Sequence, residues 1–148
     1  MRRKSFGYIY RYDKDNHPEL LVLSFKNIEY EFYRLPGGGV EENESYFDGC
    51  IREIFEESGL KNLTFVRTLA KVKYYKEYIK SDVERIDYLF YIEQDTFNEW
   101  EHSVVSNDKD NGEVFCFSWI KKDQFHLVSP EFKDRLTTDE IPEIFGRN

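Results

Sequence analysis

The sequence predicts an α/β fold in which a β-sheet is layered between helices. Short segments of alternating or continuous apolar residues recur between polar turns, which is typical of strands. One longer segment, residues 44–59, repeats its apolar residues at three- and four-residue spacing, which is typical of an amphipathic helix. Because strands and helical segments are mixed along the chain, layers of sheet and helix are expected. The sequence has no internal repeat or composition break, so residues 1–148 are expected to form one domain.

Three strands are expected before the helix. They are residues 5–12, 19–25 and 32–35. The first places Phe6, Tyr8 and Tyr10 on one face, because side chains alternate between the two faces of a strand. The second carries the apolar run Leu-Leu-Val-Leu and is separated from the first by a polar turn. The third leads into Pro36 and three glycines.

The helix has a start signal and a stop signal. Asn43, Glu44 and Ser45 offer capping and acidic residues, so the helix is expected to start near residue 44 or 45. Gly59 is expected to end it, since glycine commonly follows the last helical turn. The predicted buried stripe consists of Phe47, Cys50, Ile51 and Ile54.

Further strands and helical turns are expected after the helix. The expected strands are residues 63–75, 85–93 and 113–120, and the expected helical turns are residues 122–127 and 129–136. Residues 95–112 are polar and are expected to be irregular, with Trp100 as their one large anchor. Ser129 is expected to cap the last helical turn, with Pro130 at its first position.

Three carboxylates gather on one face of the predicted helix. At 3.6 residues per turn, Glu53, Glu56 and Glu57 fall within a sector of about 100°. The negative charges of the three carboxylates repel one another, and a hard divalent cation such as Mg²⁺ or Mn²⁺ relieves the repulsion. An acidic helix face more often points to water, so these glutamates alone would favour a solvated surface. The glycine turn, Glu44 and Arg52 at fixed offsets favour the metal site instead.

The residues from Gly38 to Leu60 read G-x5-E-x7-R-E-U-x-E-E-x-G-U, where U is a bulky aliphatic residue. This pattern is the complete Nudix box, and through it the chain resembles the Nudix hydrolases. The resemblance implies the Nudix fold, a mixed β-sheet sandwiched between α-helices. It also implies a pyrophosphatase-type enzyme in which water attacks phosphorus and a phosphoanhydride bond of a nucleoside diphosphate derivative is cleaved. Mg²⁺ or Mn²⁺ is the implied cofactor.

The resemblance also implies roles for individual residues. Glu53, Glu56 and Glu57 become metal ligands, and one of them also becomes the candidate base that activates water; which one is left open. A backbone carbonyl in the turn of Gly37 and Gly38 completes the metal shell. The supporting residues are Gly37, Glu44, Gly59 and Arg52, of which Arg52 is also counted with the catalytic group because it orients carboxylates.

A further carboxylate is expected from a loop after the helix. Glu113, just before the last strand, is the preferred catalytic candidate, with Asp108 and Asp110 as competitors. The candidate substrate contacts are Tyr33, Arg34, Arg67 and Lys73. The cations near residues 67–76 alternate with tyrosines, a pattern that equally describes a solvated strand with one packed face.

A small-molecule nucleotide is the expected substrate. The net charge of −8 argues against a broad nucleic-acid or membrane surface, and no apolar stretch is long enough to span a bilayer. Two alternatives stay open: a hydrolase of dinucleoside polyphosphates or capped RNA ends, and a sensor that binds a nucleotide without cleaving it. The two cysteines are expected to be reduced, which suits the cytoplasm, and a homodimer is left open.

Overall fold

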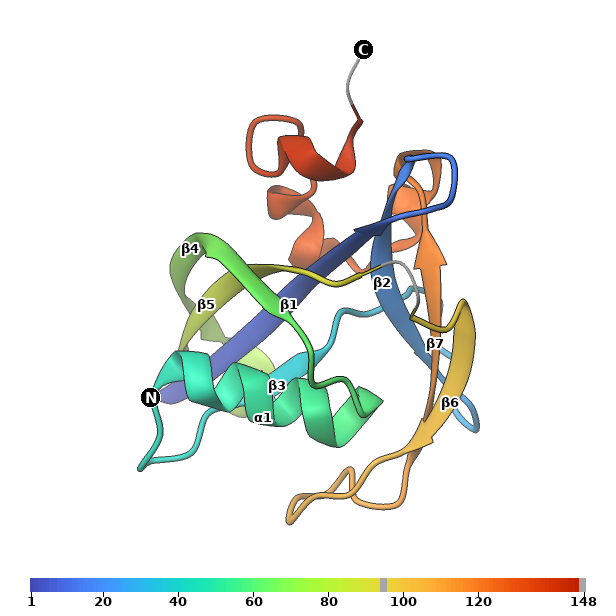
Figure 1. Ribbon diagram of the computed structural model, residues 1–148. Coiled ribbons are helices and arrows are strands. Elements are labelled where there is room, and N and C mark those ends of the chain that lie inside the picture. The colour runs from blue at the N-terminus through green and yellow to red at the C-terminus, as the bar shows by residue number, and fades with distance from the viewer. Residues whose placement is uncertain (94–95, 147–148) are drawn as a thin grey trace.

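The computed structural model describes residues 1–93 and 96–146, and within them seven strands form one mixed sheet (Figure 1). The strands are β1 (Arg2–Tyr12), β2 (Pro18–Phe25), β3 (Gly37–Gly39), β4 (Thr64–Lys76), β5 (Ser81–Tyr91), β6 (Glu99–Ser103) and β7 (Val114–Ile120). Their spatial order is β4-β5-β1-β2-β7-β6, and β3 pairs with β1. The pair β1–β5 is parallel and the other pairs are antiparallel, which confirms the mixed sheet.

The central strand β1 is paired differently along its two halves. Its C-terminal half pairs with β2, where Tyr10 lies opposite Leu20. Its N-terminal half pairs instead with β3, where Lys4 lies opposite Gly39 and Phe6 opposite Gly37. The short glycine strand β3 therefore fills the space that opens where β2 diverges from β1.

The two faces of the sheet are covered by different elements (Figure 1). The helix α1 (Tyr46–Ser58) lies on one face and packs Cys50 and Ile54 against Ile9 of β1. The other face is covered by three short 3₁₀ helices, η2 (Lys122–Leu127), η3 (Pro130–Arg135) and η4 (Pro142–Ile144). A fourth, η1 (Glu77–Ile79), joins β4 to β5. The sheet therefore lies between helical layers, as expected. No helix in the described ranges has the length and apolar character needed to cross a bilayer.

The ends of α1 are formed as predicted. The Ser45 hydroxyl accepts a hydrogen bond from the Asp48 amide at 3.0 Å. Gly59 adopts the left-handed conformation with φ 80°, and its amide donates to the Phe55 carbonyl at 2.9 Å. Side chains other than glycine rarely adopt this φ, so Gly59 fixes where the helix stops.

Two predictions about strands were wrong. Residues 32–35 form only isolated bridges at Tyr33 and Arg34, and the strand lies instead at Gly37–Gly39. Glycine is depleted in strands, but pairing with β1 overrides that propensity here. Residues 99–103, expected to be irregular, form the edge strand β6, and the Trp100 ring stacks on Phe117 with ring centroids 5.0 Å apart. Asp95, at the start of the predicted irregular segment, lies outside the described residues.

Other boundaries differ by a few residues. The first strand starts at Arg2 rather than Ser5, and β5 starts at Ser81 rather than Arg85, because these two strands pair from Arg2 and Val83 onward. The helical turns after β7 form as 3₁₀ helices, with Pro130 first in η3. The side chain of Ser129 makes no capping hydrogen bond, contrary to the prediction.

Candidate metal and phosphate site

Three carboxylates converge beside β3. Glu53 and Glu57 of α1 and Asp110 of the loop before β7 each offer an oxygen atom, and these atoms lie within 4.8 Å of one another. Glu53 is 4% exposed and Glu57 is 6% exposed. Hard oxygen donors that converge in this way suit Mg²⁺ or Mn²⁺, so the residues present fit the expected metal.

Burial makes the negative charges of this cluster costly. It raises the pKa of Glu53 to about 7, with Arg52 opposing the rise and Glu56 and Asp110 adding to it. Burial also raises the pKa of Glu57 well above its ordinary range, although the Gly37 amide partly offsets this. A bound divalent cation would favour the charged forms of both groups.

Arg52 joins the loop before α1 to the carboxylates. Its guanidinium donates to Glu44 at 2.7 and 3.1 Å, to the Gly39 carbonyl at 2.9 Å and to Glu53 at 3.2 Å. It also donates to Glu56 at 3.1 Å. The hydrogen bonds from Arg52 lower the pKa of Glu44, which therefore stays charged. Arg52 thus holds the side chains of both Glu53 and Glu56. Of these two, only Glu53 belongs to the group of three converging carboxylates.

The glycines bring backbone and carboxylate close together. Gly37 has φ 144°, and a Cβ atom there would lie 2.3 Å from the Ser5 carbonyl oxygen. Its amide donates to Glu57 at 2.8 Å. A Cβ atom on Gly38 would lie 2.9 Å from an oxygen of Glu53. The glycine strand therefore leaves room for the two helix carboxylates to approach the backbone of Gly37 and Gly38.

The loop before β7 supplies Asp110 to the converging group. Its carboxylate accepts a hydrogen bond from the Ser106 hydroxyl at 2.6 Å, and its carbonyl accepts from the Glu113 amide at 3.0 Å. Glu113 and Asp108 line the same pocket but are exposed and are not among the three converging carboxylates. The turn sequence Asp-Asn-Gly is the signal that places Asp110, because Gly112 takes φ 87° and bends the loop back.

The four candidate substrate contacts lie in different parts of the structure. Arg34 lines the pocket and pairs with Glu131 at 2.8 Å. Tyr33 packs against the apolar core on the face covered by the 3₁₀ helices. Arg67 forms an ion pair with Glu143, and Lys73 pairs with Glu84 at 3.3 Å. Of the four, the structure brings only Arg34 to the pocket lining.

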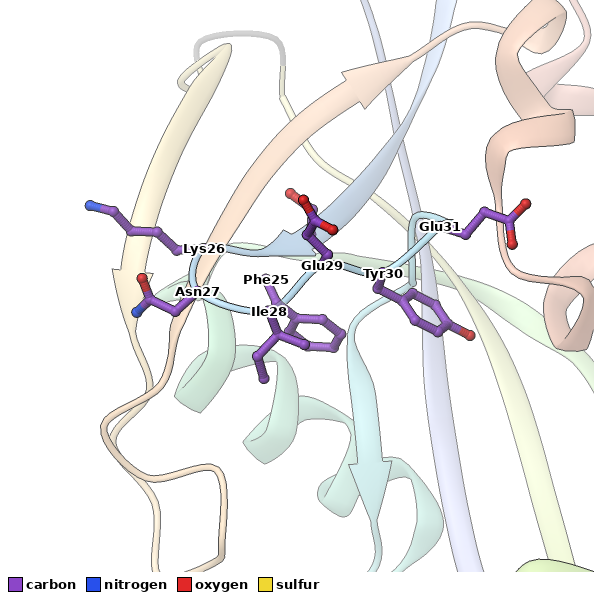
Figure 2. Close-up of a pocket in the computed structure, with 8 residues that line it drawn as sticks. Phe25, Lys26, Asn27, Ile28, Glu29, Tyr30 and Glu31 are labelled. Carbon is purple, nitrogen blue, oxygen red and sulfur yellow. The ribbon is translucent and has the colours of Figure 1, made fainter.

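The pocket that holds the cluster has a volume of about 550 Å³ and also has a cationic wall. Arg2, Arg3 and Lys4 at the start of β1 line it, and sequence analysis did not single them out. Phe25 also lines it and belongs as well to an open pocket of about 760 Å³ formed by residues 24–31. Figure 2 shows Phe25 and Tyr30 on the same side of that loop, and their ring centroids lie 6.3 Å apart. Acidic, cationic and aromatic surfaces are therefore neighbours at this site.

Stabilisation by metal is expected to increase with pH. A carboxyl group whose pKa is raised by folding contributes stability below its ordinary pKa of 4.5. This contribution is lost as pH rises through the folded value, about 7 for Glu53. Mg²⁺ or Mn²⁺ at roughly one hundred times Kd should raise the Tm by about 5–10 °C at pH 8 and by less at pH 6. Differential scanning fluorimetry with and without metal checks this, and equal shifts at both pH values would contradict it.

Comparisons with known proteins identify the family and the fold of this chain. The family model for the NUDIX domain matches residues 1–139. An RNA pyrophosphohydrolase from Bartonella henselae is 35% identical over 49 residues, which cover 33% of this chain and 27% of that protein. A crystal structure of a C. elegans Ap4A hydrolase binary complex has a TM-score of 0.66 at 17% identity, covering 92% of this chain and 93% of that one. RenU, a Nudix hydrolase from M. smegmatis, has a TM-score of 0.62 at 15% identity, covering 90% of this chain and 80% of that one.

The two solved structures confirm the expected fold, and the family model covers most of the chain. The residues from Gly38 to Leu60, which carry the resemblance, lie inside the matched range. The protein therefore belongs to the NUDIX domain family.

Proposed function

We propose that this protein is a metal-dependent pyrophosphohydrolase that cleaves a phosphoanhydride bond of a small nucleotide by attack of water at phosphorus. The observation that carries the proposal is the convergence of Glu53, Glu57 and Asp110 within 4.8 Å in a pocket whose other wall is cationic. Burial raises the pKa values of Glu53 and Glu57, so keeping these carboxylates charged costs free energy. Carboxylates on an ordinary acidic surface are exposed to water and do not carry this cost.

Each group of the chain has a distinct part in the proposed reaction. Glu53, Glu57 and Asp110 would hold Mg²⁺ or Mn²⁺, which when bound neutralises phosphate oxygens and lowers the pKa of water. Arg52 keeps Glu53 in one rotamer through the 3.2 Å hydrogen bond, and the Gly37 amide does the same for Glu57. Glu56 shares Arg52 and stays a candidate for a further metal ligand or for the base that accepts a proton from water.

A nucleotide is the proposed substrate because phosphate and base surfaces adjoin. Phe25 lines the pocket of the carboxylates and is half-buried, and its ring packs edge-to-face with the buried Phe115 at a centroid distance of 5.2 Å. Aromatic faces of this kind stack on bases. The names of the similar proteins, RNA pyrophosphohydrolase and Ap4A hydrolase, support phosphoanhydride chemistry. A sensor without activity is the second candidate, and retention of every carboxylate of the motif argues against it.

A cytoplasmic location is also proposed. Cys50 is buried and Cys116 is half-buried, and neither forms a disulfide. Reduced thiols of this kind are typical of a reducing compartment.

The bond that breaks tests the reaction. With Mg²⁺ or Mn²⁺, nucleotides that contain a phosphoanhydride should be cleaved, while nucleoside monophosphates and simple phosphate esters should be inert. Mg²⁺ or Mn²⁺ held by Glu53, Glu57 and Asp110 would neutralise phosphate oxygens and favour departure of a phosphate leaving group, which a monophosphate does not provide. In ¹⁸O-labelled water, mass spectrometry should find the label on a phosphorus-bound oxygen of one product. Efficient cleavage of a monoester, or label on a sugar carbon, would refute the proposed mechanism.

A further inference from the structure

Four cations lie in or near the pocket that holds the carboxylates. Arg2, Lys4 and Arg34 line the pocket, and Lys76, at the end of β4, is close enough to lower the pKa of Lys4. Arg2 and Lys4 are two residues apart on β1, so their side chains leave the same face of the sheet. Arg3 points the other way and donates to the carbonyls of the loop before α1.

The positive charges in this group exceed the negative ones. Arg34 pairs with Glu131 at 2.8 Å. Within residues 1–93 and 96–146, no salt bridge is formed by Arg2, Lys4 or Lys76. Lys4 is half-buried, and its pKa is lowered first by burial and then by repulsion from Lys76, with Glu131 opposing the shift. Four cations with one carboxylate form a surface that favours an anionic ligand.

The glycine strand β3 contacts both groups through neighbouring residues. Gly38 lies against Glu53, and the next residue, Gly39, lies opposite Lys4 in the pairing of β1 with β3. Neighbouring strands are about 4.8 Å apart. A Cβ atom on Gly39 would meet no atom within 4 Å, so the surface beside Lys4 is open at this residue. Arg2, Lys4 and Arg34 line the same pocket as Glu53, Glu57 and Asp110, so a chain of phosphates that extends from the carboxylates along this pocket would meet the cations.

We propose that Arg2, Lys4, Arg34 and Lys76 form a binding site for phosphates beyond the pair held at the carboxylate cluster. The protein then prefers nucleotides with a linear chain of three or more phosphates, such as nucleoside triphosphates or dinucleoside polyphosphates, over derivatives of a diphosphate. This inference rests on the proposed function and specifies its substrate class. A diphosphate derivative occupies the carboxylates and carries no further phosphate to the cations.

Inorganic tripolyphosphate and pyrophosphate test the site without hydrolysis. Isothermal titration calorimetry in EDTA removes the contribution of metal, so binding reports the cations alone. Tripolyphosphate should bind at least about tenfold more tightly than pyrophosphate, and Lys4→Gln or Lys76→Gln should weaken its binding about tenfold. The matched control is Lys14→Gln, because Lys14 is an exposed turn lysine away from the pocket, and it should bind as wild type. Absence of tripolyphosphate binding, or equal binding by Lys4→Gln and wild type, would overturn the inference.

Hydrolysis of three adenine substrates separates this inference from the proposed function. Lys4→Gln should raise the KM for ATP and for diadenosine tetraphosphate while leaving the KM for ADP-ribose near the wild-type value. Equal KM changes for all three substrates would overturn the phosphate site but leave the hydrolase intact. If no substrate is cleaved while tripolyphosphate binding depends on Lys4, the phosphate site stands and the proposed hydrolysis fails.

Discussion

Replacing Glu57 by glutamine is expected to lower hydrolysis by about 10²–10⁴-fold and to stabilise the metal-free protein. Glutamine keeps the size of the side chain, and its carbonyl oxygen can still accept the 2.8 Å hydrogen bond from the Gly37 amide. The charged ligand is lost, however, and with it most of the metal's action on water and phosphate. A loss of this size corresponds to about 3–5 kcal/mol of transition-state stabilisation.

The gain in stability follows from the buried charge. Burial raises the pKa of Glu57 well above its ordinary range, so folding disfavours the carboxylate at pH 8. A neutral side chain at the same place removes that cost. The Glu57→Gln variant should therefore melt at a higher temperature than wild type without metal, and Mg²⁺ should stabilise it less.

Two matched variants control for the loss of one negative charge elsewhere in the protein. Glu42 is exposed and has no salt bridge among the described residues, so Glu42→Gln should keep both the rate and the Tm of wild type. Glu56→Gln removes a partner of Arg52 rather than a converging oxygen. The rate of this variant should therefore lie between the rates of Glu42→Gln and Glu57→Gln. A folded Glu57→Gln protein with turnover near wild type would refute its role as a metal ligand.

The helix and its carboxylates could be predicted because their signals are local. Ser45 and Gly59 act through backbone atoms within a few residues, and the structure places both at the expected ends of α1. The apolar spacing also fixes which side of the helix is buried, so Cys50 and Ile54 lie in the core as predicted. Such signals depend little on the rest of the chain.

Other features depend on partners far along the chain. The strand β3 consists of glycines and forms because Lys4, Ser5 and Phe6 supply the hydrogen-bonding edge. Arg67 lies 76 residues before its partner Glu143, so its sequence neighbours could not indicate that pair. Tertiary contacts override local propensity in both places.

Which of the motif glutamates converge could be learned only from the structure. Periodicity places Glu53, Glu56 and Glu57 on one side of the helix without distinguishing them. In the folded protein, Arg52 takes Glu56 as a partner at 3.1 Å, while Glu53 and Glu57 turn towards β3. Arg52 contacts both Glu53 and Glu56, so the approach of Glu53 and Glu57 to the glycine strand, which lies outside the motif helix, distinguishes the converging carboxylates.

Comparing Asp110→Asn with Glu113→Gln is expected to identify the loop carboxylate that completes the site. Both residues line the pocket, but only Asp110 has an oxygen within 4.8 Å of those of Glu53 and Glu57. Asp110→Asn should lower the rate at saturating substrate by about 10²-fold or more, equivalent to about 3 kcal/mol. Asparagine keeps an oxygen that can accept the hydrogen bond from Ser106, so the Tm should change little.

Glu113→Gln should have the smaller effect, because this glutamate is exposed and makes no contact with the other two carboxylates at metal-ligand distance. Steady-state rates and metal titrations on the two variants, each with its Tm, check the comparison. Weaker metal binding by Asp110→Asn with Glu113→Gln unchanged would assign the third ligand to Asp110. A large loss of rate in Glu113→Gln with metal binding preserved would instead make Glu113 the base, as a proton acceptor need not bind the metal. Wild-type rates in both variants would mean that the helix carboxylates alone support the reaction.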